Sequence, residues 1–175
     1  MFTAVIVDAV RTPLGKRNGR LKNWHPVDLA AEMLSALTTR NDIDPAMIDD
    51  VVMGCVMQVG EQSLNIARNA VLAAGWPESV PGTSIDRQCG SSQQAIHFAA
   101  QAVMSGSMDV VIAAGVESMT RVPMGGFNIS PNPTLMGSFP QVYMAMGHTA
   151  EEVAKRFAVS RTEQEAMAVE SHAKA

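Results

Sequence analysis

Short apolar runs alternate with helix-period segments over roughly the first two thirds of the chain. Three runs are rich in β-branched or small apolar residues and have no polar face: residues 3–10, 51–57 and 109–114. Runs of this kind are typical of strands that are covered on both faces. We therefore expect three buried strands, and a further short strand just before Cys89.

The segments between these runs predict helices. One opens at Pro26 and repeats apolar residues at a spacing of three and four, and another covers residues 65–74 and is closed by Gly75. A third ends at Gly106, and Asp44-Pro45 starts a short helical turn. The apolar faces expected for the first and third helices are Ala30, Met33, Leu34 and Leu37, and Ile96, Ala99, Ala100 and Val103.

This alternation predicts an α/β domain with a largely parallel sheet. Residues 121–147 are rich in Gly, Pro, Asn, Ser and Met without any period, which is typical of a functional or mobile loop. Capping boxes at Thr149/Glu152 and Ser160/Glu163 then predict two helices, the second running to the end of the chain. We expect a core over residues 1–120 and a second part over residues 121–175.

Composition narrows the function classes. The 175 residues are 47% apolar and 17% charged, with a net charge of −4. An acidic chain of this kind attracts neither phosphate backbones nor anionic membranes, so a small-molecule substrate is favoured. No run approaches the length of a membrane span, and the apolar start lacks the basic region of a signal peptide. The two cysteines fit neither a zinc pattern nor a disulfide framework, which indicates reduced thiols, no metal and a cytoplasmic location.

Cys89 occupies a position that suits catalysis, in the stretch DRQCGSSQQAIHFAAQAVMSG over residues 86–106. A helix beginning at Gly90 directs free N–H groups toward the preceding residue, which favours a thiolate and a developing oxyanion. The strand, nucleophile and helix follow the order of a nucleophile elbow. The alternative is a small buried hydrophobe, as most free cysteines are. That alternative explains Cys55, which lies inside the apolar run VVMGCVM.

A DNA-binding interpretation is possible for residues 150–167, which scan as helix, turn and helix with Ser160 capping the second helix. That second helix would present Glu163, Glu165 and Glu170 to phosphates and repel them. The charge pattern therefore disfavours nucleic acid as a partner.

Residues 84–103, SIDRQCGSSQQAIHFAAQAV, resemble the acyl-enzyme signature of the thiolases, the acetyl-CoA C-acyltransferases. Four further segments agree with that family in order and spacing. They are AVRTPLGKRNG at 9–19, NIARNAVLAAG at 65–75, AAGVESMTRVP at 113–123, and residues 146–175. The flanking segments disfavour the ketoacyl synthases, whose nucleophile motif is similar.

The resemblance implies the first half of a thiolase-like layered fold and part of an inserted loop domain that covers coenzyme A. Thiolases cleave a 3-ketoacyl-CoA with coenzyme A, or condense two acyl-CoA molecules, without a permanently bound cofactor, and they form dimers or tetramers. Carried over by motif, Cys89 would be the nucleophile that forms the acyl thioester, and Met146 would line the acyl pocket. Ala145 stands where short-chain members have histidine, which implies a longer or bulkier acyl chain.

The family also uses an activating histidine, a second cysteine and an asparagine-bound water, which the resemblance places in a second half beyond this chain. None of the four histidines here is a clear substitute. His97 follows Cys89 by eight residues, about 12 Å along a helix and beyond hydrogen-bond reach. His148 is near the Met-Gly motif, and His25 and His172 suit the surface. A truncated and catalytically incomplete thiolase therefore remains the alternative to an active enzyme.

Overall fold

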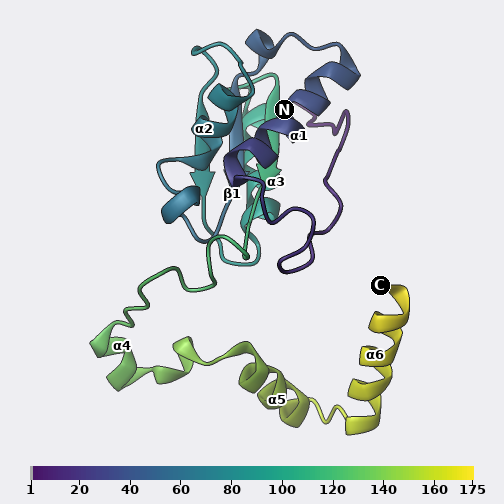
Figure 1. The fold of residues 1–175 in the computed structure, drawn as a ribbon, viewed down its shortest axis with the longest axis vertical. Coiled ribbons are helices and arrows are strands. Elements are labelled where there is room, and N and C mark those ends of the chain that lie inside the picture. The colour runs from purple at the N-terminus through teal and green to yellow at the C-terminus, as the bar shows by residue number, and fades with distance from the viewer. Residues whose placement is uncertain (1) are drawn as a thin grey trace. The chain divides into compact units, whose positions relative to one another are not determined.

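The computed structural model describes residues 2–175 and divides the chain into two compact units, Met1–Asn128 and Ile129–Ala175 (Figure 1). The boundary between the units falls after Asn128, and the expected functional division at residue 121 stays a prediction. Within residues 2–175, none of the helices is both long and apolar enough to cross a membrane.

A parallel sheet of three strands forms the centre of the first unit. The strands are β1 (Asp50–Gly54), β2 (Gly82–Ile85) and β3 (Val111–Gly115), in the order β2-β1-β3. Val51 pairs with Gly82 on one side and with Ile112 on the other. Because β1 is central, its side chains from Val51 onward are buried, as its apolar sequence predicts.

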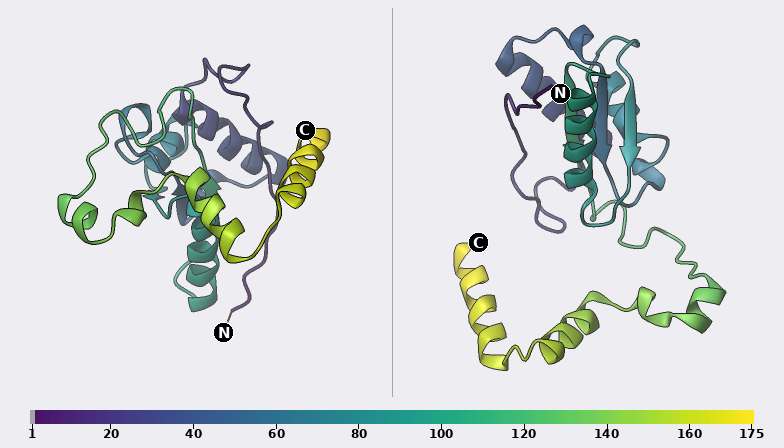
Figure 2. Two further views of the ribbon diagram at one scale, coloured as in Figure 1. Left: turned by 90° about the horizontal axis from the view of Figure 1, so that it is seen from below. Right: turned by 180° about the vertical axis from the view of Figure 1, so that it is seen from behind.

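Helices cover both faces of this sheet. The helices are α1 (Pro26–Asn41), α2 (Ile66–Ala73) and α3 (Ser91–Ser105), with 3-10 turns at Pro45–Met47 and Gly60–Gln62. The α3 helix packs against β1 and β3, whereas α1 packs on α2, which lies on β1 and β2 (Figure 2). The core lies between these layers. It includes Leu34, Val51, Met53, Ile66, Val71 and Val80. The predicted α/β class is confirmed.

The strand predicted over residues 3–10 does not form. These residues are extended but unpaired, and Val5, Ile6 and Val7 are 74–80% exposed. A strand is stable only with a hydrogen-bonded neighbour, so an apolar sequence alone cannot produce one. Asp8 instead holds the segment to the end of α1, where its carboxylate accepts hydrogen bonds from Asn41 and Arg40. The hydrogen bond from Asn41 is the main reason that the pKa of Asp8 is lowered.

Two further expectations need correction. The β1 strand ends at Gly54, so residues 55–57 lie outside it. The buried face of α3 is formed by Ser91, Ala95 and Ala99, and Ile96 is 47% exposed. Only small side chains fit here because the first turn of the helix lies directly against the strands.

The second unit consists of short helical segments and two longer helices. They are α4 (Pro133–Ser138), a 3-10 turn (Pro140–Tyr143), α5 (Met146–Arg156) and α6 (Arg161–Lys174). The segment 121–147 is therefore only partly irregular. The capping box at Thr149 is wrong, because α5 begins three residues earlier and the Thr149 hydroxyl donates to Ala145 O within the helix. The box at Ser160 and Glu163 is confirmed.

The different roles of Thr149 and Ser160 give a direct prediction. Ser160→Ala should destabilise the start of α6 by about 1 kcal/mol, because Ser160 Oγ accepts the Glu163 N–H. Thr149→Ala removes a hydroxyl that does not cap the helix, so it should change the stability of α5 by only about a few tenths of a kcal/mol. Amide hydrogen exchange in α5 and α6 measures both effects. Equal loss of protection in the two variants would contradict the assignment of the caps.

Candidate functional site

The carboxyl ends of the three parallel strands lie at one edge of the sheet, where sites in open α/β folds are usually built. The segment between β2 and α3 carries Cys89, and the segments that follow β1 and β3 lie beside it in the topology. The sheet thus places a thiol, the turn after Gly54 and the turn after Gly115 at the same edge.

Two glycines allow α3 to begin directly on the strand ends. A Cβ atom on Gly54 would overlap the backbone of Ser91 and Ser92, and one on Gly115 would overlap the Ser92 side chain. No other residue leaves room for the first helical turn at these positions. The two strand ends therefore fix the position of the helix start and of Cys89 just before it.

The turn that carries Cys89 is tightly hydrogen-bonded, whereas the helix start after it is not capped. Gln88 has φ 47°, the left-handed conformation, and its N–H donates to Asp86 Oδ1 at 2.6 Å. Cys89 is exposed, and the N-cap residue Gly90 provides no side-chain hydrogen bond to the helix. An exposed thiol next to an uncapped helix N-terminus is suited to act as a nucleophile. The assignment of this role to Cys89 stays a prediction.

Cys55 has the opposite surroundings. It is almost completely buried and follows β1 directly. Burial, followed by the negative charges of Glu117 and Asp86, raises the pKa of its thiol to about 12. Cys55 is therefore protonated at neutral pH, in agreement with a packing role.

A polar network around the exposed Glu117 and the buried Gln62 connects the segments after β1 and β3, and the sequence pattern does not predict it. Glu117 accepts hydrogen bonds from Val56 N at 2.7 Å, from Met57 N at 3.3 Å and from Gln62 Nε2 at 2.7 Å. Gln62 is fully buried and also accepts the Ser118 N–H. The carboxylate thus holds two loops together beside the strand ends. A glutamate three residues after the predicted buried strand at 109–114 was the available signal.

An ion pair between Arg121 and Glu61 joins the same two segments. Arg121 donates two hydrogen bonds to the Glu61 carboxylate and a third to Lys22 O. His25 Nε2 lies 3.9 Å from Glu61, while its Nδ1 accepts the Val27 N–H and caps α1. The Arg121 hydrogen bond is the main cause of a lowered pKa for Glu61 and of a raised pKa for Arg121.

The lowered pKa of Glu61 predicts a pH dependence of stability. The ionised form is favoured by folding, so its contribution is present above the ordinary glutamate pKa and is lost as pH falls through the lowered value. Thermal unfolding should show Glu61→Gln to be less stable than the unmodified chain at pH 7. The difference should shrink in acid below about pH 4. A difference that persists unchanged at pH 3 would contradict this account.

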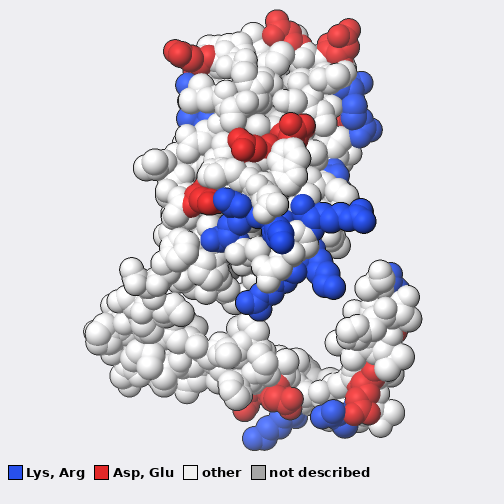
Figure 3. Space-filling view, viewed as in Figure 1, with Lys and Arg blue, Asp and Glu red and all other residues white. Residues whose placement is uncertain are grey.

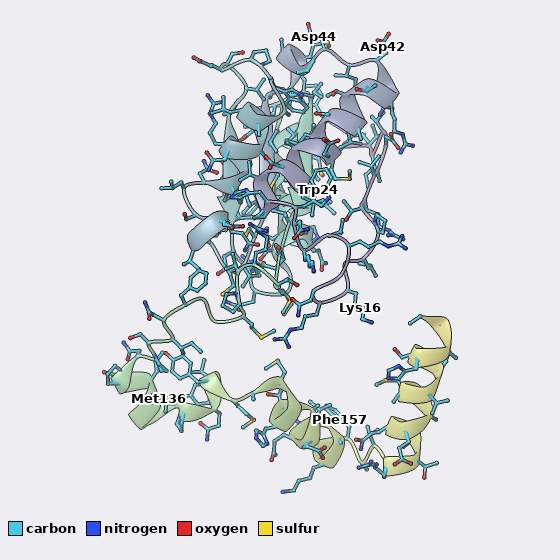
Figure 4. All side chains as sticks on the ribbon, viewed as in Figure 1. Lys16, Trp24, Asp42, Asp44, Met136 and Phe157 are labelled. Atoms are coloured by element: carbon cyan, nitrogen blue, oxygen red, sulfur yellow. The ribbon has the colours of Figure 1, made fainter. Side chains whose placement is uncertain are left out.

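A cavity of about 770 Å³ lies within the first unit, away from Cys89. Its lining includes the segment 10–17, apolar residues of α1 and the loop after β3, and Cys89 is not part of it. Lys and Arg side chains gather at the lower end of the first unit, whereas Asp and Glu side chains lie at its upper end together with some Lys and Arg (Figure 3). Figure 4 shows Lys16 directed outward at the basic end and Asp42 and Asp44 at the other.

The second predicted site residue lies in a different compact unit from Cys89. Met146 is the first residue of α5, is 70% exposed and belongs to the second unit, so its place in an acyl pocket stays a prediction. His97 is exposed on α3, and within residues 2–128 of the first unit no histidine is hydrogen-bonded to Cys89.

The fold is an α/β fold with a parallel sheet, and its exposed cysteine lies between a strand and a helix, in the order of a nucleophile elbow. The chain belongs to the thiolase family, because residues 4–175 match the family described as "Thiolase, N-terminal domain".

Known proteins agree with this assignment. The chain is 45% identical to a steroid 3-ketoacyl-CoA thiolase of Mycobacterium tuberculosis, over all of this chain and 46% of that protein. It is also 45% identical to a 3-ketoacyl-CoA thiolase of Bacillus subtilis, over 98% of this chain and 44% of that protein. The crystal structure of an acetyl-CoA acetyltransferase of Bacillus anthracis matches with a TM-score of 0.82 and 36% identity, over 99% of this chain and 46% of that one. The chain spans slightly less than half the length of these relatives.

Proposed function

We propose that the chain provides the acyl-carrying half of a thiolase, in which Cys89 forms an acyl thioester with substrates bound to coenzyme A. The observation that carries this proposal is the exposed Cys89 thiol before the uncapped start of α3, in a chain that matches the thiolase N-terminal domain. Curated relatives named 3-ketoacyl-CoA thiolase support the substrate class. The reaction belongs to the fatty-acid β-oxidation type.

The chemistry has two half reactions. The Cys89 thiolate attacks the 3-keto carbon of a 3-ketoacyl-CoA, and the bond between carbons 2 and 3 breaks. Carbon 2 leaves as the carbanion of acetyl-CoA and takes up a proton. The thiol of free coenzyme A then attacks the thioester, which releases the shortened acyl-CoA and restores Cys89. Coenzyme A is a substrate here and is consumed in each turnover.

The groups of this chain favour the first bond-forming step more than the proton transfers. The positive end of the α3 dipole lies beside Cys89, which favours the oxyanion of the tetrahedral intermediate. The other thiol, Cys55, stays protonated and buried. The alternative proposal is therefore that the chain by itself forms the thioester but does not complete thiolysis.

Three further observations support proposals on the acyl specificity, the assembly and the location of the protein. The chain has Ala145 before the exposed Met146, which supports an acyl group longer or bulkier than acetoacetyl. Exposed apolar residues at 5–7 support a homo-oligomeric assembly. Two free cysteines support a cytoplasmic location.

Exchange of labelled coenzyme A into acetyl-CoA tests the proposal, because exchange requires a covalent acyl enzyme but no carbon–carbon cleavage. We expect exchange with the unmodified chain and none with Cys89→Ser. Thiolysis of a 3-ketoacyl-CoA, measured in the same preparation, separates the two proposals. Exchange without thiolysis supports the incomplete enzyme, and absence of exchange with acyl-CoA of short and long chains contradicts both.

A further inference from the structure

The hydroxyl of Ser91 stabilises the turn that precedes α3. Gly90 is the N-cap residue of this helix and Ser91 is its first residue, so Ser91 does not occupy the position from which a serine caps a helix. Ser91 is buried, and its Oγ instead points back along the chain, where it accepts the Arg87 N–H at 2.9 Å and donates to Gln88 O at 2.6 Å. The helix start itself receives no side-chain cap.

These contacts hold the residue before Cys89 in a strained conformation. Gln88 has φ 47°, which costs a non-glycine residue free energy and persists only where neighbouring groups enforce it. Its carbonyl accepts from both Ser91 Oγ and Ser91 N, and its N–H donates to Asp86 Oδ1. The backbone N–H and the carbonyl of Gln88 are therefore both hydrogen-bonded, to Asp86 before Cys89 and to Ser91 after it.

We propose that Ser91, together with Asp86, is a positioning residue of Cys89. The two side chains hold Gln88 in the left-handed turn, and this turn places Cys89 directly before the first turn of α3. Ser91 does not touch the reacting atoms and acts only through the turn. The consequence for acyl transfer rests on the proposed function, whereas the consequence for thiol reactivity does not.

Alkylation of Cys89 by iodoacetamide tests the proposal in the full chain. A Cys55→Ala background leaves Cys89 as the only thiol. We expect Ser91→Ala to slow alkylation at pH 7 by about threefold or more, because Gln88 is then no longer held in the left-handed turn. Ser91→Thr keeps the hydroxyl and should retain most of the reactivity. Adding Gln88→Gly to Ser91→Ala should restore part of it, because glycine adopts the left-handed conformation without strain.

A buried hydroxyl elsewhere provides the matched control. Thr38 in α1 is buried and donates to the carbonyls of Leu34 and Ser35, so Thr38→Val removes a comparable group far from Cys89. We expect Thr38→Val to leave the alkylation profile unchanged. A folded Ser91→Ala variant that is alkylated like the unmodified chain, or a Thr38→Val variant that is equally slowed, would overturn the proposal.

The exposed Asp86 provides a second test if Ser91→Ala does not fold. Asp86→Ala and Asp86→Asn both remove the charge, but only the asparagine keeps an acceptor for the Gln88 N–H. We expect slower alkylation in Asp86→Ala than in Asp86→Asn, and equal rates would overturn the positioning role. Acylation by acetyl-CoA, measured on the same variants, separates the two proposals. Ser91-dependent alkylation without any acylation defeats only the proposed function, whereas acylation that does not depend on Ser91 defeats only the positioning role.

Discussion

The Cys89→Ser variant is expected to accept acyl groups from acyl-CoA at least about 10³-fold more slowly than the unmodified chain. A serine hydroxyl is not ionised at neutral pH, and the uncapped start of α3 favours an anion only where the group can lose its proton. The amount of acylated protein after a fixed time, measured by mass spectrometry, gives the ratio of the rates.

Cys55→Ala is the matched control for this prediction. Its thiol is buried and its pKa is raised to about 12, so it does not compete as a nucleophile at neutral pH. We expect Cys55→Ala to change acyl transfer by less than about twofold and to lower stability slightly through a small cavity. Acylation that survives Cys89→Ser but is lost in Cys55→Ala would reverse the assignment of the two cysteines.

The Gly54→Ala variant is expected to lower the free energy of unfolding by about 2–3 kcal/mol. A Cβ at this position would overlap the backbone atoms of Ser91 and Ser92, and backbone cannot move aside as a side chain can. The helix start would have to shift away from the sheet, so Cys89 should also react more slowly. Denaturant unfolding and iodoacetamide alkylation measure the two effects.

Gly15→Ala and Gly115→Ala are the comparisons for this variant. A Cβ on Gly15 would meet Leu21 only at ordinary contact distance, so this variant should be close to neutral. At Gly115 the overlap is with the Ser92 side chain, so adding Ser92→Gly should relieve part of its cost. If Gly54→Ala is as stable as Gly15→Ala, the close contact between α3 and β1 is not a constraint on the site.

The sequence could predict those elements whose signals are local. The Pro26 helix, the helix closed by Gly75 and the Ser160 cap are each determined by residues within one or two turns, and the structure confirms them. The apolar run at 3–10 has an equally strong local pattern, but a strand depends on a neighbour distant in the sequence. The local pattern therefore could not decide whether residues 3–10 form a strand.

The candidate site shows the same contrast between features set by neighbouring residues and features set by residues distant in the sequence. The position of Cys89 at a helix start follows from the residues around it, and the structure places the thiol there, exposed. The roles of Glu117 and Gln62 depend on hydrogen bonds that form only when separate loops meet. Such contacts join residues up to 61 positions apart, which no periodicity in the sequence records.

The most direct test of the account is peptide mapping of the unmodified chain by mass spectrometry after brief incubation with acetyl-CoA. The account predicts one acetyl group, carried on the peptide that contains Cys89, and its release when free coenzyme A is added. Acetyl groups found only on lysines or on Cys55, or an adduct on Cys89 that coenzyme A does not remove, would contradict the assignment of Cys89 as the acyl-carrying nucleophile.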